Sequence, residues 1–230
     1  MLVPSHHNTI PQFHHLTIPP HNHLTIAHMS PFYQKAFSFL LERGHKTYGK
    51  FFSLYPDDTQ IIGKLIAWFI RDEETAKTKG IDLEKGILLS GPVGCGKTSL
   101  MNLMRFFTDH NRHSMKPCRD IAFEFQKNGF EVIHRYACHS WLPNSPARIY
   151  CFDDLGTEQS LKHYGQECNV MAEIILSRYE KFTRHRDFTH FTTNLSADEI
   201  ESIYGPRVRS RLREMCNLIA FPGDARDKRR

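Results

Sequence analysis

The stretch Gly91-Pro92-Val93-Gly94-Cys95-Gly96-Lys97-Thr98 has the residue types and spacing of a phosphate-binding loop, G-x-x-x-x-G-K-[ST]. Residues 86–90 before it predict a short buried strand, and a helical pattern begins at Ser99. Glycines let successive backbone N–H groups surround a phosphate, and the helix start adds the positive end of its dipole. We expect Lys97 to reach the β- and γ-phosphates and the Thr98 hydroxyl to ligate Mg²⁺. Residues 91–99 therefore predict a nucleotide site rather than an ordinary glycine-rich turn.

An acidic pair follows about 55 residues after this loop. The apolar residues 149–152 predict a buried strand, and Asp153 and Asp154 come directly after it. In open α/β sheets, ligands bind at the carboxyl ends of the strands. Asp153 fits the carboxylate that holds Mg²⁺, and Asp154 fits the group that positions and polarises an attacking water. The alternative is a strand that ends in a capped turn, but the position downstream of a phosphate loop favours the site.

A polar amide is expected at the same edge of the sheet. Residues 188–191 predict a strand that delivers Thr192-Thr193-Asn194. The Asn194 amide is placed to hydrogen-bond the γ-phosphate or the attacking water. Ser196 then predicts a helix start, with Glu199 at the capping-box position.

Composition limits the class of protein. The 230 residues suit one α/β domain with an appendage, or two small domains. The formal charge of +5 is compatible with a nucleic-acid partner but does not require one. The most apolar run, residues 61–70, is too short to cross a membrane and contains Gly63 and Lys64. The six cysteines include no C-x-x-C pair, which indicates reduced thiols and a cytoplasmic location.

Four segments are expected along the chain. Residues 1–30 form a His/Pro-rich leader, for which a disordered low-complexity segment is favoured over a metal-binding tail. Residues 31–80 are read as a helical segment that packs on the core, 81–222 as the core, and 223–230 as a charged tail.

Within the core, residues 119–137 and 165–183 have helical spacing, the first weakened by Gly129, and residues 218–221 predict a last strand. Tyr48 and Gly49 are candidates for contact with an adenine ring. Lys162, His163 and Tyr164 are candidates for contact with single-stranded DNA, because a cation beside an aromatic ring suits backbone contact and base stacking. An ordinary exposed loop has the same appearance.

Four motifs in order resemble a known family. After the phosphate loop come Phe152-Asp153-Asp154-Leu155-Gly156-Thr157-Glu158, then Thr192-Thr193-Asn194-Leu195-Ser196, then Tyr204-Gly205-x-Arg207-Val208-x-Ser210-Arg211-Leu212. This order resembles the AAA+ ATPases of the DnaC/IstB type, the bacterial helicase loaders and transposition helpers, over about residues 50–221. The resemblance implies an α/β P-loop NTPase fold of the AAA+ (ASCE) type. Its parallel central sheet is flanked by helices, with an N-terminal helical extension and a minimal or absent C-terminal lid.

By that resemblance Lys97 and Thr98 are Walker A residues, Asp153 and Asp154 are the Walker B pair, and Asn194 is sensor 1. Arg211 matches the arginine finger that reaches the nucleotide of a neighbouring subunit, and Arg207 is a second candidate that acts in cis. The alternative for each arginine is a surface salt bridge on a helix. One departure is Asp154 where the family commonly has Glu, which predicts slow hydrolysis or a switch that mostly binds.

The resemblance implies an ATPase that uses ATP and Mg²⁺, assembles into homo-oligomers and acts on single-stranded DNA or a DNA-bound protein. No membrane partner is expected. We expect its hydrolysis to be slow and stimulated by assembly or DNA. Two alternatives remain from other classes. One is a P-loop kinase of a small molecule, which leaves the Thr-Thr-Asn and Ser-Arg-Leu motifs unexplained. The other is an ATP-gated adaptor with negligible hydrolysis.

Overall fold

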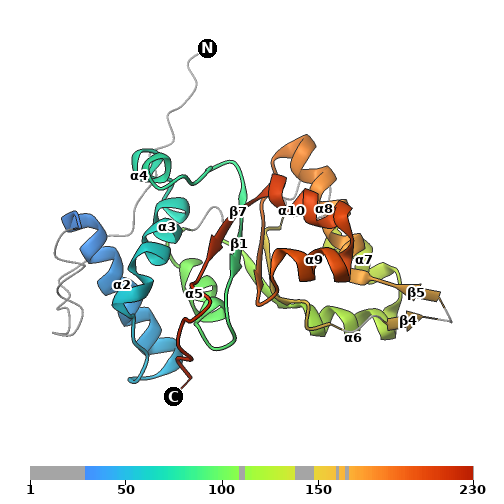
Figure 1. Ribbon diagram of the computed structural model, residues 1–230, viewed down its shortest axis with the longest axis horizontal. Coiled ribbons are helices and arrows are strands. Elements are labelled where there is room, and N and C mark those ends of the chain that lie inside the picture. The colour runs from blue at the N-terminus through green and yellow to red at the C-terminus, as the bar shows by residue number, and fades with distance from the viewer. Residues whose placement is uncertain (1–28, 109–111, 138–147, 159–160, 164–165, 230) are drawn as a thin grey trace, which may run out of the picture.

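A five-stranded parallel sheet forms the centre of the computed structural model, which describes residues 29–108, 112–137, 148–158, 161–163 and 166–229 (Figure 1). In sheet order the strands are β2 (Ser114–Pro117), β3 (Tyr150–Leu155), β6 (Thr189–Thr193), β1 (Gly86–Ser90) and β7 (Cys216–Ala220). The fold is that of an α/β P-loop NTPase, as the sequence predicts. Nearly all of the His/Pro-rich leader lies outside the described residues.

Alternation along β1 assigns the two faces of the sheet. Ile87 and Leu89 belong to one buried cluster and Leu88 to a second, because successive side chains of a strand point to opposite faces. Helices cover both faces, which is the normal environment of a parallel sheet. None of the helices in the described ranges is long and apolar enough to cross a membrane.

The first face is covered by the N-terminal helices together with the helix that follows the phosphate loop. Figure 1 shows them on the left of the sheet. They are α2 (Pro31–Tyr48), α3 (Thr59–Phe69) and α5 (Lys97–Met104), with the short η2 (Pro56–Asp58) and α4 (Glu73–Thr78) on either side of α3 in the chain. Trp68 of α3 is fully buried in their shared core.

The second face carries five more helices of the described residues, on the right in Figure 1. They are α6 (Cys118–Asn128), α7 (Glu131–Ala137), α8 (Val170–His185), α9 (Ala197–Tyr204) and α10 (Pro206–Met215). Gly129, with φ of 64°, ends α6 and divides the helical stretch that the sequence predicts over 119–137. The capping box predicted at Ser196 and Glu199 is present at the start of α9.

One predicted helix boundary is wrong. The helix expected over 165–183 begins only at Val170, because Asn169 caps it by accepting a hydrogen bond from the Ala172 N–H at 3.0 Å. The preceding residues form a small antiparallel hairpin of β4 (Leu161–His163) and β5 (Gln166–Cys168). Short strands of three residues carry too little periodicity to be distinguished from the start of a helix.

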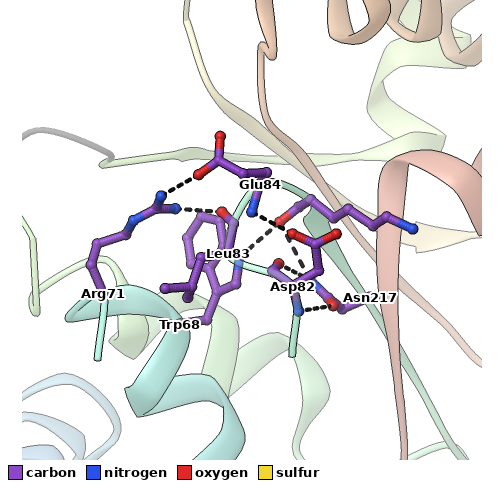
Figure 2. A network of polar contacts seen from close by, with 7 residues as sticks. Trp68, Arg71, Asp82, Leu83, Glu84 and Asn217 are labelled. Atoms are coloured by element: carbon purple, nitrogen blue, oxygen red, sulfur yellow. Dashed lines mark hydrogen bonds and ion pairs between the residues drawn. The ribbon is translucent and has the colours of Figure 1, made fainter. Parts of the chain in front are cut away.

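A polar network fixes the loop that leads into β1 (Figure 2). Asn217 of β7 accepts a hydrogen bond from the Asp82 N–H at 2.8 Å and donates to the carbonyls of Asp82 and Gly86 at 2.7 and 3.0 Å. From the helical side, the Trp68 indole donates to the Lys85 carbonyl at 2.7 Å. The start of β1, and hence the phosphate loop after it, is therefore tied both to the edge strand and to α3.

Two buried histidines lie against β1 in the same core. The Ile87 N–H donates to Nδ1 of His190 at 3.1 Å, and Nε2 of His113 bonds the Met101 carbonyl at 2.9 Å. The imidazole rings are 5.2 Å apart. Desolvation by burial lowers the pKa of His113 from 6.5 to about 4 and moves the pKa of His190 well below its usual value. Both rings are neutral in the folded protein at neutral pH.

Because the two histidines have lowered pKa values, we expect the free energy of unfolding to fall at acidic pH. Below the unfolded pKa near 6.5, the unfolded chain binds protons that the folded core does not, so stability is lost as pH falls toward the folded pKa. For His113 this amounts to about 1 kcal/mol of unfolding free energy between pH 7.5 and 5.5. Urea denaturation at the two pH values measures it.

The matched pair of variants is His113→Phe in the core and His185→Gln on the surface. We expect the first to reduce the pH dependence and the second to leave it unchanged, because His185 is exposed. An equal slope in wild type and His113→Phe would show that His113 is not the source of the acid sensitivity.

Candidate functional site

The phosphate loop connects β1 to α5 at the carboxyl edge of the sheet. Gly94 and Gly96 have φ of 82° and 97°, a region that side chains disfavour, and Gly96 is the N-cap residue of α5. Lys97 is 5% exposed, and its Nζ donates to the carbonyls of Gly91 and Pro92 at 2.7 and 2.9 Å. The lysine ammonium therefore lies within the loop, where the backbone N–H groups at the helix start add positive potential.

Asp153 joins this loop to β3 and β6. Its Oδ1 accepts hydrogen bonds from the hydroxyls of Thr98 at 3.0 Å and Thr192 at 2.6 Å. The side chain is 6% exposed, and desolvation raises the pKa of Asp153 while the Thr192 hydrogen bond opposes that rise. A threonine hydroxyl and a carboxylate side by side are hard oxygen ligands of the kind that Mg²⁺ prefers. The donor set of Thr98 and Asp153 therefore fits this cation.

Asp154 occupies an irregular position at the end of β3. The pairing of β3 with β6 shifts register between Phe152 and Leu155, and Asp154 has a positive φ of 55°. Its N–H donates to the Thr192 hydroxyl at 2.9 Å, while Thr157 donates to its carbonyl through its hydroxyl at 2.7 Å. Bulges of this kind re-aim a side chain. Here the result is that Asp154 borders a cavity at the phosphate loop.

Asn194 reaches the same cavity from β6. The strand end is fixed on both sides: the Gly91 N–H donates to the Thr193 carbonyl at 3.2 Å, and the Thr193 hydroxyl donates to the Leu155 carbonyl at 2.7 Å. Asn194 follows as an exposed residue on the wall of the cavity. Because β6 lies between β1 and β3, its end falls between the phosphate loop and the acidic pair.

The cavity has a volume of about 300 Å³ and is built from five segments of the chain. The phosphate loop and the start of α5 line it, together with Asp154, Thr157 and Asn194. Residues 51–55 and the C-terminal residues Lys228 and Arg229 complete it, and sequence reasoning missed both groups. Phe51, Phe52 and the basic C-terminus can be recognised in the sequence, but no spacing rule relates them to the phosphate loop.

Tyr48 and Gly49, the candidates for contact with an adenine ring, do not line the cavity. The Tyr48 ring is stacked on Phe52, and its hydroxyl accepts a hydrogen bond from Asn102 at 2.8 Å. Phe52 lines the cavity, so Tyr48 lies behind a lining residue. The side chains of Lys162 and His163, and all of Tyr164, are outside the described part of the structure.

Arg211 and Arg207 are both on α10 and do not line the cavity of their own chain. The Arg211 guanidinium lies over the Tyr179 ring at 4.4 Å from its centroid and 3.9 Å from a carboxylate oxygen of Glu214. Arg207 is exposed at the start of the helix. The structure therefore brings Lys97, Thr98, Asp153, Asp154 and Asn194 together and leaves the two arginines outside this group.

Two further motif residues have a structural contact. The Glu158 carboxylate accepts hydrogen bonds from the Tyr204 hydroxyl and, at 3.0 Å, from the Gly156 N–H. Burial raises the pKa of Glu158, and the contact with Tyr204 opposes this. The turn after the acidic pair is thereby held to the junction of α9 and α10.

A scan against protein-family models finds no match, and a search of curated proteins finds no relative. Among solved structures, a crystal structure of the DnaC helicase loader is similar to this chain at a TM-score of 0.42 and 20% sequence identity. The similarity covers 60% of this chain and 79% of the other.

We expect the Thr192 hydroxyl to contribute measurably to the free energy of unfolding. Thr192→Val removes the donor to Asp153 and the acceptor for the Asp154 N–H, and we expect a loss of about 1–3 kcal/mol in the free energy of unfolding. Thr192→Ser keeps the hydroxyl and loses one methyl group, so its cost is about 1 kcal/mol or less. Urea denaturation at pH 7 compares them, and equal losses in the two variants would contradict a role for the hydroxyl.

Proposed function

We propose that this chain binds ATP with Mg²⁺ and hydrolyses it slowly. The observation that carries the proposal is the arrangement at one cavity: a phosphate loop with Lys97 inside it, the Thr98 hydroxyl 3.0 Å from Asp153, and Asp154 and Asn194 among the residues that line the cavity. A Gly-rich loop supplies affinity for phosphate, and the neighbouring carboxylates add the groups that hydrolysis needs.

Binding is assigned to the loop and to Thr98 with Asp153. The N–H groups of residues 94–99 and the Lys97 ammonium hold the phosphates, and Pro92, Val93 and Cys95 shape the loop. Thr98 and Asp153 would hold Mg²⁺, which when bound offsets the negative charge of the phosphates. Burial of Lys97 and Asp153 reduces the screening of their charges by water.

Hydrolysis is assigned to Asp154 and Asn194. Asp154 accepts a proton from a water as the water oxygen forms a bond to the γ-phosphorus, and the bond from that phosphorus to the leaving ADP oxygen breaks. The Asn194 amide orients the same water or the γ-phosphate. The bulged backbone of Asp154 is held by Thr192 and Thr157, which keeps the carboxylate at the cavity without the longer side chain of a glutamate.

Two variants separate binding from turnover. Lys97→Ala removes the cation in the loop and is expected to abolish binding of a fluorescent ATP analogue. Asp154→Asn keeps the shape but not the base, so binding should persist while steady-state hydrolysis falls by about 10²–10⁴-fold. If Asp154→Asn changes neither the binding of the analogue nor the rate of hydrolysis, the protein is better described as an ATP-gated adaptor with negligible hydrolysis.

We further propose that the site is completed by a second copy of the chain and that the assembly acts on single-stranded DNA or a DNA-bound protein. Arg211 does not line the cavity of its own subunit, is one-third exposed, and contacts a surface carboxylate and an aromatic ring. An arginine in this position acts on a nucleotide only across an interface between subunits. The DNA partner is supported by the order of the sequence motifs and by the positive charge of the chain.

Mixing two inactive variants tests the shared site. Arg211→Ala retains an intact phosphate loop, while Lys97→Ala retains its arginine, so their mixture contains interfaces at which one complete site forms. We expect each variant alone to lose about 10³-fold in rate or more, and the mixture to exceed the sum of the two. Hydrolysis by the wild type should rise faster than linearly with protein concentration and increase with single-stranded DNA.

Rates that are linear in protein, with no effect of DNA and no rescue in the mixture, would contradict the assembly. Turnover that instead rises with a small phosphate acceptor would favour the kinase.

A further inference from the structure

The C-terminal segment, residues 222–229, returns to the phosphate loop after β7. The Phe221 N–H donates to the Ser90 carbonyl at 2.8 Å, a turn follows, and the Lys228 N–H then donates to the Gly94 carbonyl at 3.0 Å. Figure 1 shows this red segment running from β7 past α5. The chain thereby adds a backbone contact to a loop that lies more than a hundred residues earlier.

The Lys228 side chain makes the tighter contact. Its Nζ donates to the Cys95 carbonyl at 2.6 Å and to a carboxylate oxygen of Asp58 at 2.6 Å. The two side chains of this ion pair are only 13% and 8% exposed. Water therefore screens the attraction between the two charges less than it does on an open surface. One ammonium thus connects η2, the phosphate loop and the C-terminus.

These contacts determine how two peptide groups of the loop are turned. In a trans peptide, the carbonyl oxygen and the N–H of the next residue point in opposite directions. With the Gly94 and Cys95 carbonyls held by Lys228, the N–H groups of Cys95 and Gly96 face the other way. The Cys95 N–H makes only a long 3.4 Å bond to the Pro92 carbonyl, which a phosphate oxygen can replace. A loop that encloses a phosphate needs its N–H groups, not its carbonyls, turned inward.

We propose that Lys228 is a positioning residue of the nucleotide site, which holds the Gly94 and Cys95 carbonyls outward so that the loop presents its N–H groups to phosphate. The proposal rests on the proposed function. Asp58 neutralises the ammonium while it makes this contact, so the lysine stays on the carbonyl in the absence of nucleotide. Gly94, whose carbonyl accepts the Lys228 N–H, has a φ of 82°, which favours glycine at this position.

The test is a titration of the full chain with a fluorescent ATP analogue and Mg²⁺. Lys228→Met removes the Nζ contacts but keeps the backbone N–H, and we expect binding to weaken roughly tenfold, as for loss of one charge-assisted hydrogen bond. Lys228→Arg, which keeps the cation, should restore most of the affinity. Asp58→Asn should weaken binding by a smaller factor than Lys228→Met.

The matched control is Arg226→Gln, which removes a charge from the same segment. Arg226 contacts Asp57 and the Tyr55 ring and does not line the cavity, so its loss should leave the affinity unchanged. Hydrogen exchange of the loop amides without nucleotide is the second measurement. We expect faster exchange in Lys228→Met and no change in Arg226→Gln.

The outcomes separate the two proposals. If the wild type binds, Lys97→Ala does not, and Lys228→Met binds like the wild type, then the role of Lys228 is overturned and the proposed function stands. Weaker binding in Lys228→Met with unchanged exchange in the loop also overturns the positioning role. If the wild type itself does not bind the analogue, both proposals fail.

Discussion

A carboxylate that is nearly buried requires hydrogen-bond donors, and the rest of the site follows from how Asp153 obtains them. The donors are hydroxyls from α5 and β6, so that the phosphate-loop helix and the strand beside β3 must both reach the same oxygen. This is possible because β6 lies between β1 and β3 in the sheet. The Thr192 hydroxyl also accepts the Asp154 N–H, and the two neighbouring carboxylates therefore share one support.

The helices at the N-terminal end of the described chain belong to this support rather than to a separate unit. Trp68 donates to the loop before β1, and its ring meets the buried His190 edge-on at 4.8 Å between centroids. His190 in turn accepts the Ile87 N–H of β1. A buried neutral imidazole costs less to desolvate than a charged one, so the fold loses stability as the pH falls below the unfolded pKa, where the unfolded chain binds protons that the folded core does not.

Local patterns predicted the elements well, and the contacts between distant segments were beyond them. The phosphate loop, β3 with its acidic pair, the strand before Asn194 and the capping box at Ser196 each follow from a few adjacent residues. The hairpin before α8 was missed because three-residue strands carry almost no periodicity. No local sequence pattern indicates the role of Lys228, because a lysine in a basic C-terminal segment looks like any solvent-exposed lysine. Only the fold places it beside Asp58.

The charges at the phosphate loop are arranged so that its nucleotide-free form keeps the shape that binding needs. Lys97 is held by two carbonyls at the start of the loop and Lys228 by a carboxylate and a third carbonyl, so neither ammonium is left unpaired. An unpaired buried cation would be costly, because its charge would be removed from water without a hydrogen-bond acceptor to replace it. Under the proposed function, a triphosphate would meet a loop whose Gly94 and Cys95 carbonyls are already turned outward, and less of its binding free energy would be spent on rearranging the loop.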